Sequence, residues 1–371
     1  MTVLLDPPAW PAHDRLWSHL VSDTSLHELR SFARAVGVPD RGFDLDHYDV
    51  PAERYDDLVA AGAVPLDGGT LARRLAASGL RVPGHERRRA YRGTLLDRWD
   101  PLWRHEAAAA HHLAVGTDLV DRWREPHRVY HSRLHLADVL DRLDELVADG
   151  APGSPWHAAV ALWFHDAVHD GATPADEDAS AALVGDLLGP LVGVAHPAVD
   201  AAPDPRAGAR AGADAAGRPA PLTAADVAEV ARLVRLTAGH DPAPDDAIGA
   251  LVSDADLAVL GAPPARYARY VAQVRAEYGH VPDAAFRRGR GAVVDHLLAL
   301  HDGPGLFRTA AGRHRWSHAA GTNLRTEAAG LSRDAAGPTH GSGSGADGGQ
   351  GSGSTTADGS RPEGHDRDED A

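Results

Sequence analysis

Two histidine-rich clusters hold the side chains of this chain that are best suited to metal chemistry. The first, residues 130–135, is YHSRLH, and the second, residues 163–169, is WFHDAVH. Imidazole and carboxylate groups among apolar helical residues are costly to bury unless a partner satisfies them. We expect that partner to be a divalent metal ion, because the adjacent pair His165-Asp166 can offer one nitrogen and one oxygen ligand from a single helical turn.

Further histidines and aspartates extend this pattern over three predicted helices. His131 and His135 are four residues apart and therefore share one helix face, and His127 extends the row by a turn. A third apolar segment places Asp254 and Asp256 in a helix. These ligand types suit manganese, iron(II), cobalt, nickel, zinc or magnesium, as one ion or two, with positions left for water. A single histidine on an apolar face is usually a core residue, but three ordered pairs favour a metal site.

The composition excludes several other kinds of chemistry. Cysteine is absent from the 371 residues, which rules out thiolate nucleophiles, disulfides and cysteine-based zinc sites. All 37 basic residues are arginine, which rules out a P-loop lysine and Schiff-base chemistry. The net charge of −16 argues against nucleic acid as a partner, since no positive field neutralises phosphates. The 23 histidines are therefore the main reactive nitrogens.

The length predicts two domains rather than one core. Residues 1–83 are expected to form a small α/β domain, because short apolar runs alternate with amphipathic helical segments. Strands are expected at residues 3–5 and 63–66, with helices at 25–33 and 70–78. Asp23 or Thr24 is expected to cap the first of these helices. A basic, polar hinge is expected at residues 84–92.

The remainder of the chain is expected to be all-α. Residues 93–331 have helical periodicity and little alternation typical of strands. Residues 189–221 are rich in alanine, proline, glycine and aspartate and predict a disordered insertion, and residues 332–371 predict a disordered tail. No apolar run approaches the roughly 18 residues that a membrane span requires, and no basic leader is present, so a soluble cytoplasmic protein without membrane partners is expected.

The ordered motifs resemble the HD-domain superfamily of metal-dependent phosphohydrolases, and most of all its bacterial branch of predicted phosphohydrolases. The similar motifs lie at residues 128–135, 162–168, 254–261 and 275–278, and the resemblance covers about residues 99–331. It implies an all-helical HD-type fold and metal chemistry, but it does not identify a substrate. The insertion at residues 189–221 departs from this branch.

The resemblance also implies roles, aided by a similarity of the first cluster to helical cyclic-nucleotide phosphodiesterases. The implied metal ligands are His135, His165, Asp166 and Asp256, with Asp254 as the alternative to Asp256. The implied catalytic residues are His131 as general acid, Asp166 as a bridging carboxylate if two ions bind, and His169 as a supporting histidine. The candidate substrate-binding residues are Arg128, Glu177, His240, Arg275 and Arg290.

The expected function is hydrolysis of a phosphate monoester or diester in a small nucleotide-like molecule by a metal-activated water. Arginines would neutralise the phosphate oxygens. The alternative is a nucleotide-sensing module whose N-terminal domain binds a partner. A third hypothesis makes the N-terminal domain the enzyme and the helical domain its regulator. The oligomeric state is not indicated.

The N-terminal segment, residues 1–82, is similar to a small bacterial family of uncharacterised domains. Polar side chains gather there in short, non-periodic stretches at residues 17–24 and 46–50. These side chains are candidates for a second site. Alternatively, they cap helices and turns. The residues concerned are His19, Asp23, His27, His47 and Asp49.

Overall fold

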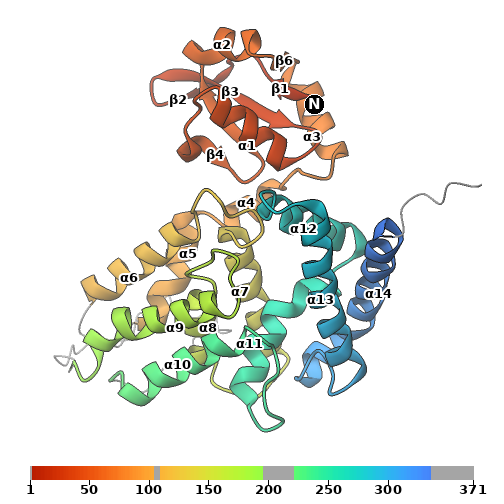
Figure 1. Cartoon of the computed structure of the whole chain (residues 1–371). Helices are drawn as coiled ribbons and strands as arrows, with labels where there is room; N and C mark the ends of the chain where they lie inside the picture. Colours follow the sequence, from red (N-terminus) through yellow and green to blue (C-terminus); the bar gives the residue numbers. More distant parts are fainter. Residues whose placement is uncertain (1, 104–108, 195–220, 336–371) are drawn as a thin grey trace, which may run out of the picture. The chain divides into compact units, whose positions relative to one another are not determined.

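The computed structural model describes residues 2–103, 109–194 and 221–335 (Figure 1). Residues up to 83 form a small sheet with helices, here called the N-terminal module. Residues 84–335 form what we call the helical region, and its described residues contain no strand. The sequence-based prediction of a small sheet-containing domain followed by a mostly helical part is therefore confirmed at this level.

The N-terminal module contains six strands in the order β4-β5-β3-β1-β6, with β2 paired to β3. Only β1 and β6 pair in parallel, and the other pairs are antiparallel. Two of the three central strands, β3 and β5, coincide with the stretches that the sequence analysis treated as non-periodic. The strands are β1 Val3–Leu5, β2 Trp10–Ala12, β3 Arg15–Ser22, β4 Phe43–Asp44, β5 His47–Pro51 and β6 Val64–Pro65.

Helices cover both faces of this sheet. Helix α1 (Leu26–Ala35) packs on the face that carries Leu20, and α3 (Gly68–Ala77) packs on the face that carries Val21. The cap of α1 is Ser25, whose Oγ accepts a hydrogen bond from the Glu28 amide at 3.1 Å, so the prediction of Asp23 or Thr24 as the cap was wrong. The short helix α2 (Tyr55–Ala60) completes the module.

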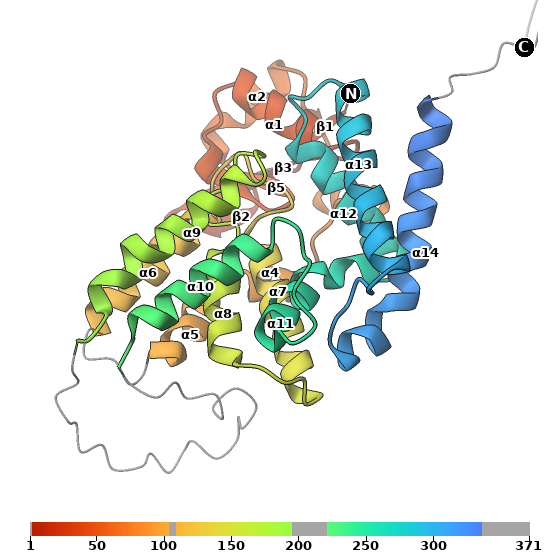
Figure 2. The ribbon, with the colours of Figure 1, turned by 60° about the horizontal axis from the view of Figure 1, so that its bottom comes forward.

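The helical region is built around α8, which contacts α7, α9, α10 and α11. Its nearly uniform apolar surface is explained by these neighbours, because a helix surrounded by others buries every side. Helices α9 and α10 lie side by side (Figure 2). The helices are α4 Gly84–Arg89, α5 Arg92–Trp99, α6 Ala109–Arg122, α7 Arg133–Ala148, α8 Pro155–Phe164, α9 Ala175–Leu188, α10 Ala224–Leu236, α11 Ala247–Leu257, α12 Pro264–Glu277, α13 Asp283–Asp302 and α14 Ala310–Ala335. Short 3-10 turns occur at η1 Asp40–Gly42, η2 Ala52–Arg54, η3 Asp100–Trp103, η4 Gly189–Leu191 and η6 Ala258–Gly261.

Three predicted segment boundaries differ in the structure. The expected hinge at 84–92 contains helix α4, which contacts α7. The expected disordered insertion begins with η4, whose Leu191 is buried in the helical core, and residues 195–220 of it lie outside the described residues. Helix α14 continues to Ala335, and the predicted tail beyond it also lies outside the described residues.

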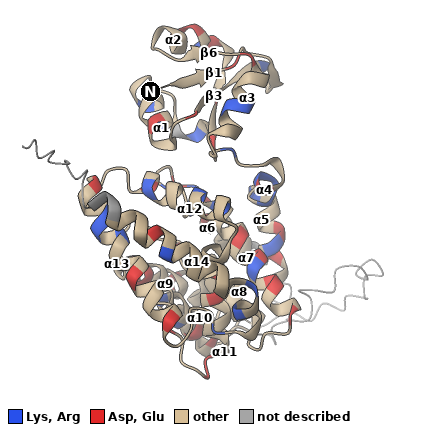
Figure 3. Ribbon diagram, turned by 90° about the vertical axis from the view of Figure 1, so that its right-hand side faces the viewer, with Lys and Arg blue, Asp and Glu red and all other residues tan. Residues whose placement is uncertain are grey.

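Acidic and basic positions are interspersed along the helices (Figure 3). Helix α7 carries several of the pairs: Arg89 donates to Asp138 and Asp141, and Arg98 also donates to Asp141. Among the described residues, no helix combines the length and the apolar character needed to cross a bilayer.

Candidate metal centre

Three segments of the helical region supply the predicted metal ligands. His135 lies in the first turn of α7, and Asp256 lies in the last turn of α11. His165 and Asp166 follow the last residue of α8, so they lie just beyond a helix and not within one as predicted. The end of an apolar helix thereby brings both side chains into the interior.

The predicted row of histidines on one helix face was wrong. Helix α7 begins at Arg133, so His127 and His131 precede it. His127 is exposed, and its Nε2 lies 2.7 Å from the carbonyl oxygen of His169. His131 reaches the site from the loop before α7.

Ligand atoms of His135, His165 and Asp256 all lie within 4.8 Å of one another, and Oδ2 of Asp166 lies beside the two histidines. The Nε2 atoms of His135 and His165 lie 3.2 Å apart. Nε2 of His135 lies 3.2 Å from Oδ1 of Asp256, and Nε2 of His165 lies 3.1 Å from Oδ2 of Asp166. The cross distances are 3.8 Å from His135 to Asp166 and 3.6 Å from His165 to Asp256.

The three shorter separations, of 3.1 to 3.2 Å, fit neighbouring ligands of a metal ion. Two atoms that each lie about 2.1 Å from one ion are about 3 to 3.4 Å apart at octahedral or tetrahedral angles. His165 Nδ1 lies 2.8 Å from the Leu162 carbonyl oxygen, which leaves Nε2 free to coordinate. Two imidazoles and two carboxylates are also the donor set that suits the divalent ions named above.

The charges of the cluster favour a cation at its centre. Burial opposes a charge on His165, but the carboxylates of Asp166 and Asp256 raise its pKa to about 9. Burial would raise the pKa of Asp166, yet His165 beside it holds that pKa well below the ordinary value of 3.8. Burial lowers the pKa of His135, which favours the neutral imidazole that binds metals. A proton or a divalent ion can supply the positive charge.

The structure separates the two candidate aspartates. Asp256 belongs to the cluster, whereas the buried Asp254 accepts hydrogen bonds from the backbone amides of Arg308 and Thr309 at 2.7 and 2.8 Å. It also accepts the hydroxyl of Thr309 at 2.6 Å. Asp254 therefore fixes the start of α14 and is not placed to coordinate a metal at the cluster.

His240 was predicted to bind substrate, and the structure places it beside Asp256. Its Nε2 lies 3.5 Å from Oδ2 of Asp256, and its Nδ1 lies 3.4 Å from the hydroxyl of Ser253. Its backbone has a φ of 51°, an uncommon conformation for a residue other than glycine. Such strain often occurs at functional sites, so His240 is a further candidate ligand or substrate contact.

A second group of side chains surrounds His131. Its Nδ1 lies 2.5 Å from Oε1 of Glu277, and Nε2 of His169 lies 3.0 Å from the same oxygen. The other Glu277 oxygen accepts the backbone amides of Val129, Tyr130 and His131. His131 Nε2 in turn lies 4.0 Å from Oδ2 of Asp166.

Glu277 is the site residue that the sequence analysis missed. It was part of the motif at residues 275–278, but its depth in the structure was not evident from its place at the end of a polar helix. Burial opposes a charge on His131, but Glu277 raises the pKa of His131 above 6.5. Burial would raise the pKa of Glu277, but His131 holds it well below 4.5.

The three arginines predicted to bind substrate all have other partners. The side chain of Arg128 is fully buried and donates to the carbonyl oxygens of Asp166 and Ala167 at 2.6 and 3.2 Å. Arg275 binds Asp283 and two carbonyl oxygens after α12. Arg290 is buried and paired with Glu327. Their hydrogen bonds in the structure are made to the protein, which does not favour the predicted role in substrate binding.

Glu177 lies near the cluster. Its Oε1 accepts the Thr173 hydroxyl at 2.9 Å, and its buried Oε2 has no hydrogen-bond partner among the described residues. Burial raises the pKa of Glu177, and the charge of Asp166 adds to this effect.

One part of the chain resembles a known family. Residues 3–78 match the model of a family described as a protein of unknown function, DUF4031. The match covers most of the N-terminal module, in agreement with the predicted similarity to uncharacterised domains. The predicted HD-domain resemblance of the helical region finds no support in these comparisons. Neither among curated proteins nor among solved structures was a match found.

A cavity of about 270 Å³ adjoins the candidate metal centre. His135 and Asp256 line it, together with Arg89, Arg142 and Arg266. Arg266 donates from Nη2 to Asp138 at 2.8 Å, but its buried Nη1 has no hydrogen-bond partner among the described residues. The cavity thus combines ligand-type side chains with a guanidinium group that can donate to an oxyanion. The spacing of these arginines in the sequence carried no such signal, since they come from three different helices.

Proposed function

We propose that the helical region is a metal-dependent phosphohydrolase of the HD type, which cleaves a phosphate monoester or diester of a small nucleotide-like molecule. The observation that carries this proposal is the approach of two neighbouring imidazole nitrogens to one carboxylate oxygen each of Asp166 and Asp256, at 3.1 to 3.8 Å. The donors come from three segments far apart in the sequence, and this is typical of a site that is built for a ligand.

In this proposal, His135, His165, Asp166 and Asp256 hold one divalent ion, or two if Asp166 bridges. Such an ion would polarise the phosphate ester and activate a water at neutral pH. His131 acts as the general acid: Glu277 binds its Nδ1, keeps it protonated and directs its Nε2 toward Asp166. His169 shares the same Glu277 oxygen and so limits the movement of both rings.

The cavity supports an anionic substrate. Arg266 has one guanidinium nitrogen that is buried and unpaired among the described residues, and buried donors are costly unless they find an acceptor. A phosphate oxygen supplies such an acceptor, with a charge-assisted hydrogen bond. Arg89 and Arg142 also line the cavity, but their guanidinium groups pair with carboxylates of α7. We therefore assign phosphate binding to Arg266 instead of Arg128, Arg275 and Arg290.

The test is metal content together with hydrolysis in the same samples. Wild type and the double variant His165→Ala/Asp166→Ala are purified, measured by elemental analysis, and assayed with p-nitrophenyl phosphate and its bis ester. Manganese, cobalt, zinc or magnesium is added in turn. We expect wild type to bind metal and hydrolyse at least one ester, and the double variant to bind one ion fewer and to lose the hydrolysis.

The matched control is Asp178→Asn on α9, whose exposed carboxylate only pairs with exposed Arg235. It should keep the metal and the activity. If wild type stays inactive with every ion, the proposed enzyme activity is refuted and a nucleotide-sensing module is favoured. Nucleotide binding without turnover would then identify such a module.

A further inference from the structure

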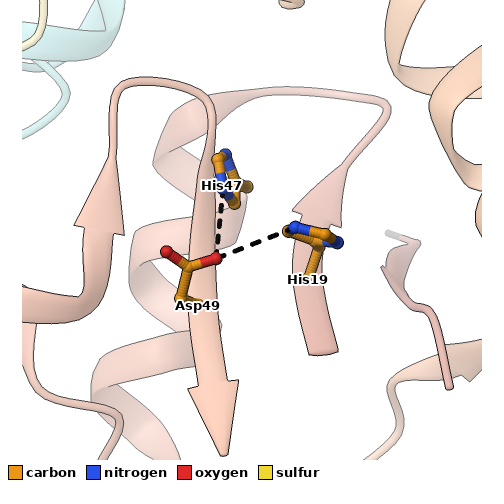
Figure 4. Close-up of side chains that lie close together, drawn as sticks. All are labelled: His19, His47 and Asp49. Atoms are coloured by element: carbon orange, nitrogen blue, oxygen red, sulfur yellow. Dashed lines mark ion pairs between the residues drawn. The ribbon is translucent and has the colours of Figure 1, made fainter. Parts of the chain in front are cut away.

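A second group of possible metal ligands lies in the N-terminal module. One nitrogen each of His19 and His47 and an oxygen of Asp49 all lie within 4.8 Å of one another. Figure 4 shows the two rings and the carboxylate turned toward each other from neighbouring strands. None of these residues belongs to the candidate centre of the helical region.

The register of the sheet brings the three side chains together. His19 in β3 is the direct antiparallel partner of Asp49 in β5. His47 precedes Asp49 by two residues, so both side chains lie on the same face of the strand. Nε2 of His47 lies 3.3 Å from Oδ1 of Asp49, and Nε2 of His19 lies 3.9 Å from the same oxygen.

This part of the sheet face is open. Leu4 and Val21 lie on the same face and pack against α3. The His19 side chain is 28% exposed and that of Asp49 is 47% exposed. A metal ion at this position would therefore keep coordination sites for water or a substrate, as in catalytic sites.

Buried carboxylates orient both histidines. Nδ1 of His19 lies 2.9 Å from Oδ2 of Asp6, and Nδ1 of His47 lies 2.7 Å from Oδ1 of Asp46. Asp6 and Asp46 are almost completely buried. Arg87 donates to Asp46 and lies 3.2 Å from Nδ1 of His47, farther than the carboxylate. Each carboxylate accepts a hydrogen bond from Nδ1–H and so directs Nε2 to a metal as the ligand atom, which is the outer-shell arrangement of metal-binding histidines.

We propose that His19, His47 and Asp49 bind a divalent transition-metal ion of the zinc or iron(II) class, with Asp6 and Asp46 as positioning residues. Two histidines and one carboxylate with open positions form a donor set used for metal-assisted chemistry. The site lies within residues 3–78, the segment that matches the family of unknown function. The proposal is independent of the function assigned to the helical region.

Cobalt(II) titration of the full chain tests the site. The chain is stripped with a chelator, dialysed and titrated with CoCl₂, and the number of bound ions is measured by calorimetry and elemental analysis. Wild type is compared with His19→Ala and Asp49→Asn. Each variant should bind one ion fewer, and the d–d absorption of that ion should be lost.

Two controls separate this result from other causes. His13→Asn changes an exposed histidine of the same module, and its φ of 51° is one that asparagine accepts, so it should bind as wild type does. The same comparison is repeated with His165→Ala/Asp166→Ala in the background, so the helical centre cannot account for the lost ion. Asp49 is half-exposed, so its asparagine variant should fold, and thermal unfolding without metal checks this.

The positioning residues give a second measurement. Asp6→Asn should weaken cobalt binding about 10- to 100-fold without removing a ligand. The exposed Trp10 ring lies 5.1 Å from that of His19, so bound cobalt should quench its fluorescence, and Trp10→Phe should remove that part of the quenching. If His19→Ala and Asp49→Asn bind as many ions as His13→Asn, these side chains form only a hydrogen-bonded network and the proposal is overturned.

Discussion

Single side chains of the helical region divide into those that face the cluster and those that hold the backbone around it. Asp256 and Asp254 are two residues apart, yet only Asp256 contacts His135. Asp254 is occupied by the Arg308 and Thr309 amides. The difference arises because α11 turns the two carboxylates to different neighbours.

This division predicts opposite effects of two similar substitutions. Asp256→Asn should remove the metal ion of the helical region while leaving the free energy of unfolding of the metal-free protein nearly unchanged. Asp254→Asn should retain the metal but lower that free energy by about 1 to 3 kcal/mol, because buried amides lose a charged acceptor. Elemental analysis and urea unfolding measure both quantities. Equal metal loss in the two variants would contradict the assignment.

The pair of His131 and Glu277 predicts a dependence on pH. The pKa of Glu277 is lowered from 4.5, so its stabilising effect is present above pH 4.5 and is lost as the pH falls further. The pKa of His131 is raised from 6.5, so its effect is present below pH 6.5 and is lost as the pH rises through the raised value. The pair should therefore stabilise most between these two values.

Glu277→Gln should reduce the free energy of unfolding by about 1 to 3 kcal/mol at pH 5.5, and by less at pH 8.5. If the protein is the proposed hydrolase, the basic limb of its pH–rate profile should also move to lower pH in Glu277→Gln. Glu327→Gln is the control, because it breaks a buried pair with Arg290, whose charge does not change in this range. A loss that is the same at both pH values for Glu277→Gln would refute the pairing.

At the scale of elements, the helices approach each other closely where glycine replaces a side chain. A Cβ on Gly116 of α6 would lie 2.3 Å from a carbon of the Trp99 ring on α5. A Cβ on Gly185 of α9 would meet nothing within 4 Å. The first glycine permits helix packing, whereas the second only weakens its own helix.

These two glycines predict changes of opposite sign. Gly116→Ala should lower the free energy of unfolding by about 1 to 3 kcal/mol, because the buried indole ring cannot move away freely. Gly185→Ala should raise it by about 0.5 to 1 kcal/mol through helix propensity. Thermal or denaturant unfolding of both variants is the measurement. Equal effects would show that α5 and α6 do not pack through this contact.

At the scale of the whole molecule, metal ions should link the sites to stability. A ligand that binds only the folded chain stabilises it by about 2.7 kcal/mol when the free ligand concentration is 100 times the dissociation constant. Chelation should therefore lower the melting temperature of wild type, and readdition of metal should restore it. The fall in melting temperature on chelation should be smaller in His165→Ala/Asp166→Ala, and smaller still when Asp49→Asn is added. A melting temperature that chelator does not change would contradict both proposed metal sites.

Much of the architecture followed from local pattern. The helical periodicity of residues 93–331 led to the observed helices, because apolar residues at intervals of three and four form a buried stripe whatever the partner is. The suitable chemistry of His135, His165 and Asp256 was also evident from the sequence, since these side chains recur in ordered pairs with others beside apolar segments. Strands β3 and β5 were missed, because half of their residues face a polar cluster and the alternation is obscured.

What the sequence alone determined was which residues have suitable chemistry and which segments are helical. The tertiary structure alone decided which of them meet. It separated Asp256 from Asp254, directed Arg128 to carbonyl oxygens, and introduced Glu277 and Arg266 to the site. It likewise joined His19 to Asp49 across two strands. The physical reason is that distances between segments depend on packing and strand register, which no single segment contains.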